Sequence, residues 1–235
     1  MSGQIYALLR GEILAGRYEP GEALPSERRL SEELETSRHG IREALKRLQQ
    51  AGLVAISQGG ATRVRDWRRH GGLELLLEGE VPEALEAPRA AMEMRACIGA
   101  DAARRCAERA SAVPRAQIRA RAEQLAAVED LDARNAHYDV LWDLIVEGAD
   151  NIAYRLALTT LVERQTIASL KTDAVARELA DAAAIKALAR AIAYGEADQA
   201  HEHARELLER SIPPARAGAA AASGVDAAGD NPRGR

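Results

Sequence analysis

Four basic side chains near the N-terminus have the types and the spacing to bind a polyanion. They are Arg38, His39, Arg42 and Lys46. The apolar residues of the same segment, Ile41, Leu45 and Leu48, recur at intervals of four and three, as on one face of an α-helix. A helix that buries this face turns its basic residues outward, mostly in its N-terminal half, and the grooves of B-DNA are the obvious partner for such an edge.

The flanking residues predict a helix-turn-helix that positions this basic edge. Ser26 stands where an N-cap is expected, ahead of the same-face pair Leu30 and Leu34. After a short connection, Ser37 is the expected N-cap of the second helix. Gly52 is free to adopt the left-handed conformation that ends this helix. The two helices are therefore expected to pack through their apolar stripes.

A β-hairpin is expected directly after the second helix. The runs 53–58 and 61–65 are β-prone and are separated by Gly59 and Gly60, which favour a two-residue hairpin loop. A helix-turn-helix followed by a hairpin is a winged helix. A plain amphipathic helical hairpin can also carry a basic face that is merely solvated. The ordered combination of caps, apolar stripe, hairpin and basic edge nevertheless favours DNA binding.

Three motifs within residues 4–66 give a more specific indication. They are I-x-x-G-x-x-x-P-G-x-x-L-P-S-E-R-x-L at 13–30, S-R-x-x-I-R-E-A-L at 37–45 and L-x-x-L-x-x-x-G-L-V at 45–54. On these motifs the segment resembles the DNA-binding domain of the GntR family of transcriptional regulators. The sequence that follows, GGATRVRDWRRHGGLELL, is similar to the fatty-acid-responsive (FadR-type) branch, in which the wing leads through an aromatic linker into the next helix.

The resemblance implies a homodimer that binds a short palindromic operator in double-stranded DNA. It places DNA contacts at Arg28, Ser37, Arg38, His39, Gly40 and Arg42, and at Gln58 and Gly59 on the wing tip. An arginine can pair in bidentate fashion with guanine, which discriminates between bases by about 1–3 kcal/mol. Gly40 either allows a close approach to the duplex or is a tolerated weak point that costs the helix about 1 kcal/mol. His39 either contacts a phosphate or is simply exposed.

The composition predicts a helical protein with a sizeable core and a local basic surface. The chain has 235 residues, of which 47% are hydrophobic and only 3% aromatic, and it has no Phe. Its abundant Ala favours closely packed helices over sheets. The net charge of −4 is unevenly distributed, with about +1 on residues 1–66 and about −5 on the remainder. No signal peptide or membrane-spanning run is evident, which predicts a soluble, cytoplasmic protein.

From about Trp67 onward the pattern is helical, which predicts an antiparallel bundle and a mainly α fold class. The expected helices cover 82–110, 114–128, 132–147, 151–170, 174–194 and 197–210. The last residues are rich in Ala, Gly and Pro, which predicts a disordered tail. The expected organisation is a winged-helix DNA-binding domain at 1–66, a helical effector-binding and dimerisation domain at 67–212, and the tail at 213–235.

Three segments of this expected bundle resemble, more weakly, the ligand-sensing domain of the same GntR branch. They are EMRACIGADAARRCAERA, VLWDLIVEGADN ending at Asn151, and ALARAIAYGEADQAHEHARELL. The family's larger subgroup binds a divalent metal through one Asp and three His. Those positions fall here on Tyr138, Trp142, Ile185 and Leu207. We therefore expect no metal and no cofactor, and metal-independent sensing is favoured.

Tyr138 and Trp142 lie one helical turn apart and offer a mostly apolar surface, unless both are plain core residues. The resemblance implies that Arg95 faces the same cavity, where its guanidinium could hold a carboxylate or a phosphate. We therefore expect an acidic effector, such as a fatty acid or acyl-CoA, bound by Arg95, Tyr138, Trp142 and Asn151. A regulator that responds to a small organic acid and a non-catalytic helical interaction protein are the alternatives.

An enzyme is not expected. The sequence shows no nucleophile–base set and no metal-binding cluster. Gly59-Gly60 is too short for a phosphate-binding loop and precedes a strand instead of a helix. The helical interaction protein could explain the second part of the chain, but it leaves the winged helix without a role.

Overall fold

The computed structural model of the chain describes residues 2–57, 60–77, 86–163 and 176–215. Its N-terminal elements are α1 (Ser2–Leu14), α2 (Glu27–Glu33), α3 (Arg38–Gln50), β1 (Val54–Ala55), β2 (Arg63–Val64), α4 (Trp67–His70) and α5 (Glu74–Leu77). They are followed by α6 (Ala87–Arg109), α7 (Ala112–Ala127), α8 (Leu131–Gly148), α9 (Ile152–Glu163), α11 (Ala182–Tyr194) and α12 (Ala197–Glu209). The predicted mainly α fold class with a small antiparallel sheet is confirmed.

The helix caps form where the sequence predicted them. Ser26 Oγ accepts a hydrogen bond from the Arg29 backbone N–H at 3.3 Å, which starts α2, and Ser37 Oγ accepts one from the Gly40 N–H at 3.2 Å, which starts α3. Gly52 ends α3 with a φ of 75°. Apolar residues of α1, α2 and α3 form a common buried cluster that includes Ile5, Leu9, Ile13, Leu30, Ile41, Leu45 and Leu48.

The hairpin is shorter than the sequence indicated. Its strands are two residues long and antiparallel, with Val54 opposite Val64 and Ala55 opposite Arg63. Both valines are buried, and burial of this single pair sets the register. The predicted two-residue connection is therefore wrong, because residues 56–62 separate the strands. Arg63 also forms a bridge with Ala23, so the segment ahead of α2 takes part in the pairing.

The segment that follows the hairpin packs onto the N-terminal core. Leu75 in α5 is buried in the same cluster as the first three helices, and Arg10 Nη2 donates to its carbonyl oxygen at 3.0 Å. A Cβ atom at Gly52 would lie 2.0 Å from the carbonyl oxygen of His70, so the end of α3 is in close backbone contact with the end of α4. The N-terminal core thus extends beyond residue 66, and the proposed boundary there stays a prediction.

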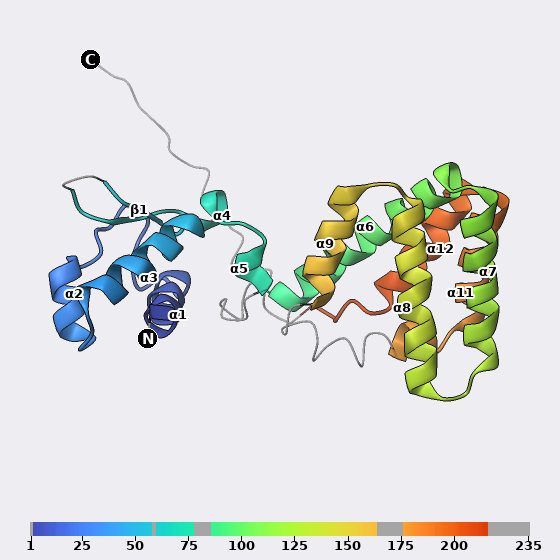
Figure 1. Cartoon of the computed structure of the whole chain (residues 1–235), viewed down its shortest axis with the longest axis horizontal. Coiled ribbons are helices and arrows are strands. Elements are labelled where there is room, and N and C mark those ends of the chain that lie inside the picture. The colour runs from blue at the N-terminus through green and yellow to red at the C-terminus, as the bar shows by residue number, and fades with distance from the viewer. Residues whose placement is uncertain (1, 58–59, 78–85, 164–175, 216–235) are drawn as a thin grey trace, which may run out of the picture.

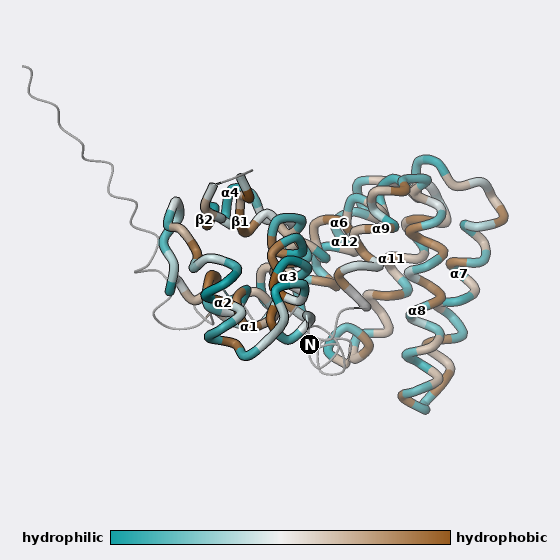
Figure 2. The backbone as a smooth tube through the Cα atoms, turned by 60° about the vertical axis from the view of Figure 1, so that its left-hand side comes forward, coloured by the Kyte–Doolittle hydropathy of each residue, from teal (hydrophilic) through white to brown (hydrophobic). Residues whose placement is uncertain are grey.

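The remaining helices form a bundle, which lies on the other side of α5 from the winged helix (Figure 1). In the bundle, α6 contacts α8, α9, α11 and α12, and α7 contacts α8 and α11. Hydrophobic and hydrophilic residues alternate along these helices, as Figure 2 shows. Among the described residues, no helix has both the length and the hydropathy that a membrane span requires.

One predicted helix is interrupted. The sequence predicted a single helix over 174–194, but α11 begins only at Ala182, where the Asp181 side chain accepts a hydrogen bond from the Ala184 N–H at 2.9 Å. Residues 176–179 are helical and are separated from α11 by Ala180 and Asp181. The other predicted ends that fall on described residues agree within two residues. The predicted start at 82, the predicted end at 170 and residues 216–235 of the tail lie outside the described residues.

Candidate nucleic-acid interface and ligand site

The basic edge of α3 is exposed as predicted. Ile41, Leu45 and Leu48 are fully buried against the N-terminal core, which fixes the rotation of the helix about its axis. The opposite face carries the exposed residues Arg38, His39, Arg42 and Lys46. The first three lie in the N-terminal half of the helix, the half with which a recognition helix contacts base edges.

Carboxylates pair with some of the cationic side chains on and near this edge of α3. Arg42 Nε lies 2.7 Å from Glu27 Oε2, and Arg28 Nη1 lies 3.2 Å from Glu32 Oε1. In the described part of the chain, Arg38 has no hydrogen bond or ion pair of its own. Exposed pairs of this kind stabilise a protein by only about 0.2–1 kcal/mol, so a DNA phosphate or base can replace the carboxylate at little cost. The three arginines are therefore available to a polyanion.

Gly40 is not required by the packing around it. An added Cβ would lie 3.5 Å from the Ser37 and Thr36 hydroxyl oxygens and 3.6 Å from Ile5 Cδ1, all ordinary van der Waals distances. Alanine would therefore fit and would favour the helix by about 1 kcal/mol. The packing of α3 therefore does not explain this glycine.

The wing contributes less to the described surface than the sequence suggested. Gln58 and Gly59, the predicted wing-tip contacts, lie outside the described residues. Arg63 was not singled out from the sequence, although it is exposed on β2 and its Nη1 donates to the Gly21 carbonyl oxygen at 2.8 Å. This bond ties the wing to the segment that leads into α2.

Three of the four predicted effector residues meet inside the bundle around an acidic residue that the sequence reasoning missed. Arg95 Nη1 and Nη2 donate to the two carboxylate oxygens of Glu178 at 2.6 and 3.0 Å. Tyr138 Oη donates to Glu178 Oε2 at 2.5 Å, and Trp142 packs edge-on against Tyr138 with a ring separation of 6.2 Å. The Glu178 side chain is 0% exposed and that of Arg95 is 13% exposed. The guanidinium of Arg95 therefore already holds a carboxylate, instead of facing an open cavity.

Burial and charge act strongly on this cluster. Burial by itself lowers the pKa of Arg95, but the charge and hydrogen bonds of Glu178 outweigh it, so the pKa is raised and the guanidinium stays charged. Burial, together with the adjacent carboxylate of Glu178, raises the pKa of Tyr138 well above its ordinary value, so its hydroxyl stays protonated and donates. Ser211 Oγ lies 3.4 Å from Arg95 Nη1 and completes the polar shell.

Asn151, the fourth predicted effector residue, lies at the start of α9. Its side-chain oxygen accepts a hydrogen bond from the Ala153 N–H at 3.0 Å, which caps the start of α9. The four positions that hold metal ligands in the larger subgroup lie together in the bundle core, where Tyr138, Ile185 and Leu207 are buried and Trp142 packs against them. Among the described residues, no cluster of three or more His, Cys, Asp or Glu is placed to hold a metal ion.

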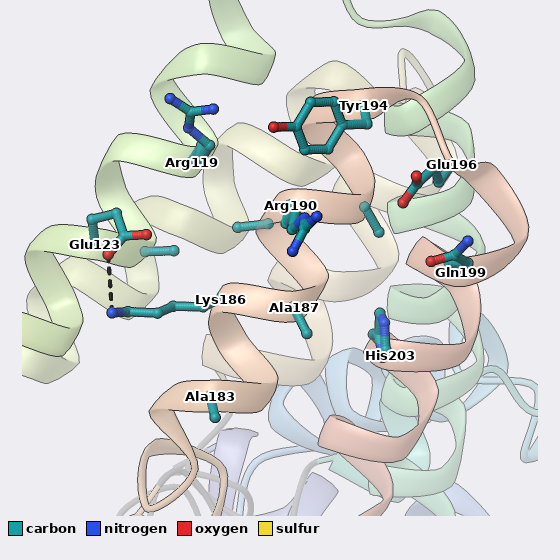
Figure 3. A pocket seen from close by; sticks show the side chains of 13 residues that line it. Arg119, Glu123, Ala183, Lys186, Ala187, Arg190, Tyr194, Glu196, Gln199 and His203 are labelled. Carbon is teal, nitrogen blue, oxygen red and sulfur yellow. Dashed lines mark ion pairs between the residues drawn. The ribbon is translucent and has the colours of Figure 1, made fainter.

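An open groove of about 790 Å³ lies elsewhere, over α7, α11 and α12. Figure 3 shows Arg119 and Glu123 on one side, His203 and Gln199 on the other, and Ala183 and Ala187 along its floor. Lys186 lies 3.0 Å from Glu123 across it. None of the predicted effector residues lines this groove.

A signal for Glu178 was present in the sequence. Glu178, Ile185 and Ile192 are spaced by seven residues, and Ile185 and Ile192 are fully buried. An acidic residue in register with a buried apolar stripe indicates a buried partner of opposite charge. Which cation it meets could not be predicted, because Arg95 is 83 residues away in the chain.

This sequence is similar to those of bacterial transcriptional regulators. The model of the family described as "Bacterial regulatory proteins, gntR family" matches residues 1–64. The HTH-type transcriptional regulator Mce2R of Mycobacterium tuberculosis is 36% identical over 215 residues, which are 88% of each chain. The fatty acid metabolism regulator protein of Vibrio cholerae is 41% identical over 64 residues, which cover 27% of this chain and 23% of that protein. A solved structure described as Streptococcus agalactiae GntR covers 89% of this chain and 98% of its own, at 19% identity and a TM-score of 0.44.

Proposed function

This chain belongs to the GntR family of bacterial regulatory proteins and is a DNA-binding transcriptional regulator, and on that premise we propose that α3 reads its operator. The observation that carries the proposal is the exposed basic edge of α3 opposite a fully buried apolar stripe. Arg38 and Arg42 make the base contacts, each able to pair in bidentate fashion with guanine. Arg28, Ser37 and His39 contact the phosphates, and Gly40 lets the backbone approach them.

The proposed DNA-bound form is a homodimer on a palindromic operator. Two copies of α3 would enter successive major grooves of one DNA face, roughly 34–36 Å apart, as two-fold symmetric helix-turn-helix proteins do. Gln58 and Gly59 are proposed to contact the minor groove beside each half-site. The proposed organisation keeps residues 1–66 for DNA binding and 67–212 for effector binding and dimerisation.

The test is the affinity of the full chain for the intergenic DNA upstream of its own gene, measured by fluorescence anisotropy at several salt concentrations. We expect affinity to fall steeply with salt, because phosphate contacts release counterions. Arg38→Ala should weaken specific binding by about 1–3 kcal/mol. Arg205→Ala is the matched control, since Arg205 is an exposed arginine on α12 that pairs with Glu202 and Glu209. Equal losses in both variants would contradict α3 as the reading element.

We further propose that a small acidic effector, such as a fatty acid or acyl-CoA, changes operator affinity by binding at Arg95, Tyr138 and Trp142. Their convergence in the bundle supports the proposal, since one cation beside aromatic surface suits an acidic head on an apolar body. Asn151 is proposed to act there through the start of α9. A small organic acid is the second candidate, and the buried Arg95 supports it equally well.

A physical route connects this site with the DNA-binding surface. The linker 66–72 begins with the Asp66 cap of α4, and its His70 carbonyl touches the end of α3 at Gly52. Arg10 of α1 holds Leu75 of α5, and α5 contacts α6, the helix that carries Arg95. A shift of α6 is therefore proposed to change the position of α3. To change occupancy substantially, the effector must prefer one state by a few kcal/mol.

The effector proposal is tested by repeating the anisotropy titration with decanoate, decanoyl-CoA and citrate. A change in operator affinity that is lost in Arg95→Met supports an acidic effector at this site. A response to decanoate alone supports a fatty acid as the effector, and a response to citrate alone supports a small organic acid. Operator binding that ignores all three would remove the effector proposal and leave the DNA-binding proposal intact.

A further inference from the structure

The carboxylate of Glu178 is bound as a ligand would be bound. Its two oxygens receive three donors from two different helices, namely both terminal nitrogens of Arg95 and the hydroxyl of Tyr138, at 2.5–3.0 Å. Paired parallel N–H donors are the geometry with which arginine recognises a free carboxylate. The side chain is 0% exposed. The donor set is therefore a complete carboxylate-binding site that is already filled by the chain itself.

We propose that Arg95 and Tyr138 form a carboxylate-binding site whose resident ligand is Glu178, and that an acidic effector binds there by displacing it. This inference rests on the proposed effector function and specifies its chemistry. The ligand must carry an anionic group, because a neutral molecule that displaced Glu178 would leave the guanidinium of Arg95 buried without a counter-charge. The paired donors of Arg95 favour a carboxylate in that role. An exchange of one carboxylate for another keeps the cluster neutral.

The backbone around Glu178 allows such an exchange without unfolding of α11. Glu178 lies in the helical residues 176–179, which end before the Asp181 cap at which α11 begins. The cap is secured independently, since Asp181 Oδ2 lies 2.6 Å from Arg210 Nη1. The turn itself is held by Arg134, whose Nη2 donates to the Leu179 carbonyl oxygen. Glu178 can therefore leave its place while α11 keeps its own N-terminus.

A further donor lies beside the cluster. Trp142 Nε1 is buried and makes no hydrogen bond among the described residues, although it lies close enough to the Tyr138 hydroxyl to offset part of the rise that burial causes in the pKa of that group. Its ring contacts that of Tyr138. A buried donor without an acceptor costs free energy, and an incoming ligand with more acceptor atoms than Glu178 could satisfy it.

The test uses the full chain with Glu178→Ala and the thermal unfolding midpoint as readout. Propionate is the probe because it has the carbon chain and charge of a complete Glu side chain, and propionamide is its neutral counterpart. We expect propionate to raise the midpoint of Glu178→Ala saturably and by several degrees more than that of the wild type. Propionamide should have no such effect. The double variant Arg95→Met/Glu178→Ala should lose the response, because the guanidinium that binds the carboxylate is gone.

Glu123→Ala is the matched control variant. Glu123 also pairs with a cation on another helix, Lys186 at 3.0 Å, but this pair is exposed. Its midpoint should respond to propionate as the wild type does. A folded Glu178→Ala that gains no more from propionate than Glu123→Ala overturns the inference.

A second variant covers the case in which Glu178→Ala does not fold. Glu178→Gln keeps the shape of the side chain and removes its charge, so decanoate should bind it at least tenfold more tightly than it binds the wild type, as measured by calorimetry. Equal affinities would overturn the inference. If propionate restores Glu178→Ala while wild-type operator binding ignores decanoate and decanoyl-CoA, the carboxylate site stands and the proposed effector function fails. If decanoate or decanoyl-CoA alters wild-type operator binding but propionate does not restore Glu178→Ala, the proposed effector function stands and the carboxylate site fails.

Discussion

Two arginine–carboxylate pairs with similar shortest distances lie in very different surroundings in this protein. Arg42 and Glu27 approach to 2.7 Å at the DNA-binding surface, with side chains 63% and 38% exposed. Arg95 and Glu178 approach to 2.6 Å in the bundle, with side chains 13% and 0% exposed. Distance does not distinguish them, whereas the solvent around them does.

The comparison shows how one interaction type serves two purposes. In water the attraction is screened and the pair contributes little, so Arg42 is easily transferred from Glu27 to a DNA phosphate. Inside the bundle each charge depends on the other, because both are largely removed from water. Exchange there requires an incoming group of the same charge. The first pair therefore permits binding to any polyanion, and the second restricts its ligand to an anion that fits the buried donors.

The largest effect that would sharpen this contrast is expected from Arg95→Met. The variant leaves Glu178 buried without a counter-charge, and the free energy of unfolding should fall by about 3–5 kcal/mol. Combining it with Glu178→Leu should recover most of the loss, because no charge then remains buried. Urea unfolding monitored by circular dichroism measures both. A loss below about 1 kcal/mol would place the buried pair in the class of exposed pairs.

Tyr138→Phe tests the third member of the buried cluster. Removing the hydroxyl leaves Glu178 Oε2 with Arg95 Nη2 as its donor in place of two donors, which should cost about 1–3 kcal/mol. Because burial and Glu178 raise the pKa of Tyr138 in the folded state, its contribution is fully present below the ordinary pKa of 10.0 and is lost as the pH rises towards the folded value. The thermal midpoint of the wild type should therefore fall above pH 10 by more than that of Tyr138→Phe. Tyr194→Phe, at an exposed site on α11, is the control.

Gly40→Ala separates stability from function on the exposed side of the comparison. The packing admits a Cβ, so the free energy of unfolding should rise by about 1 kcal/mol. Operator affinity should fall, because the added methyl group separates the start of α3 from the DNA backbone. Thermal unfolding and anisotropy on the same sample measure the two effects. A variant that is more stable and binds DNA as well as the wild type would show that Gly40 is only a tolerated weak point.

The smallest effect on stability is expected from Glu27→Gln. The exposed pair with Arg42 is lost, and the free energy of unfolding should change by less than about 1 kcal/mol. Operator affinity should increase, since Arg42 no longer has a competing carboxylate. Glu32→Gln, which frees Arg28 in the same way, is a useful companion. A stability loss as large as that of Arg95→Met would break the comparison.

The winged helix could be predicted closely because its signals are local. Each signal depends on residues only a few positions away in the sequence. These signals are the caps at Ser26 and Ser37, the apolar stripe from Ile41 to Leu48 and the glycine at 52. The wing was predicted less well, since its two-residue strands depend on the burial of one valine pair against the helices. The break before α11 was missed, because the capping geometry of Asp181 competes with a continuous helical pattern that the sequence shows equally well.

The sequence by itself determined the class of this protein, the helices and the basic edge of α3. These depend on periodicity, capping and motif spacing, which operate over short stretches of chain. Only the tertiary structure decided that Arg95 is occupied and that Glu178 is the central acid of the bundle. Such pairings join residues 40 to 83 positions apart, and they exist because burial removes water and leaves each charge or hydroxyl dependent on whatever partner the packing of the helices brings to it.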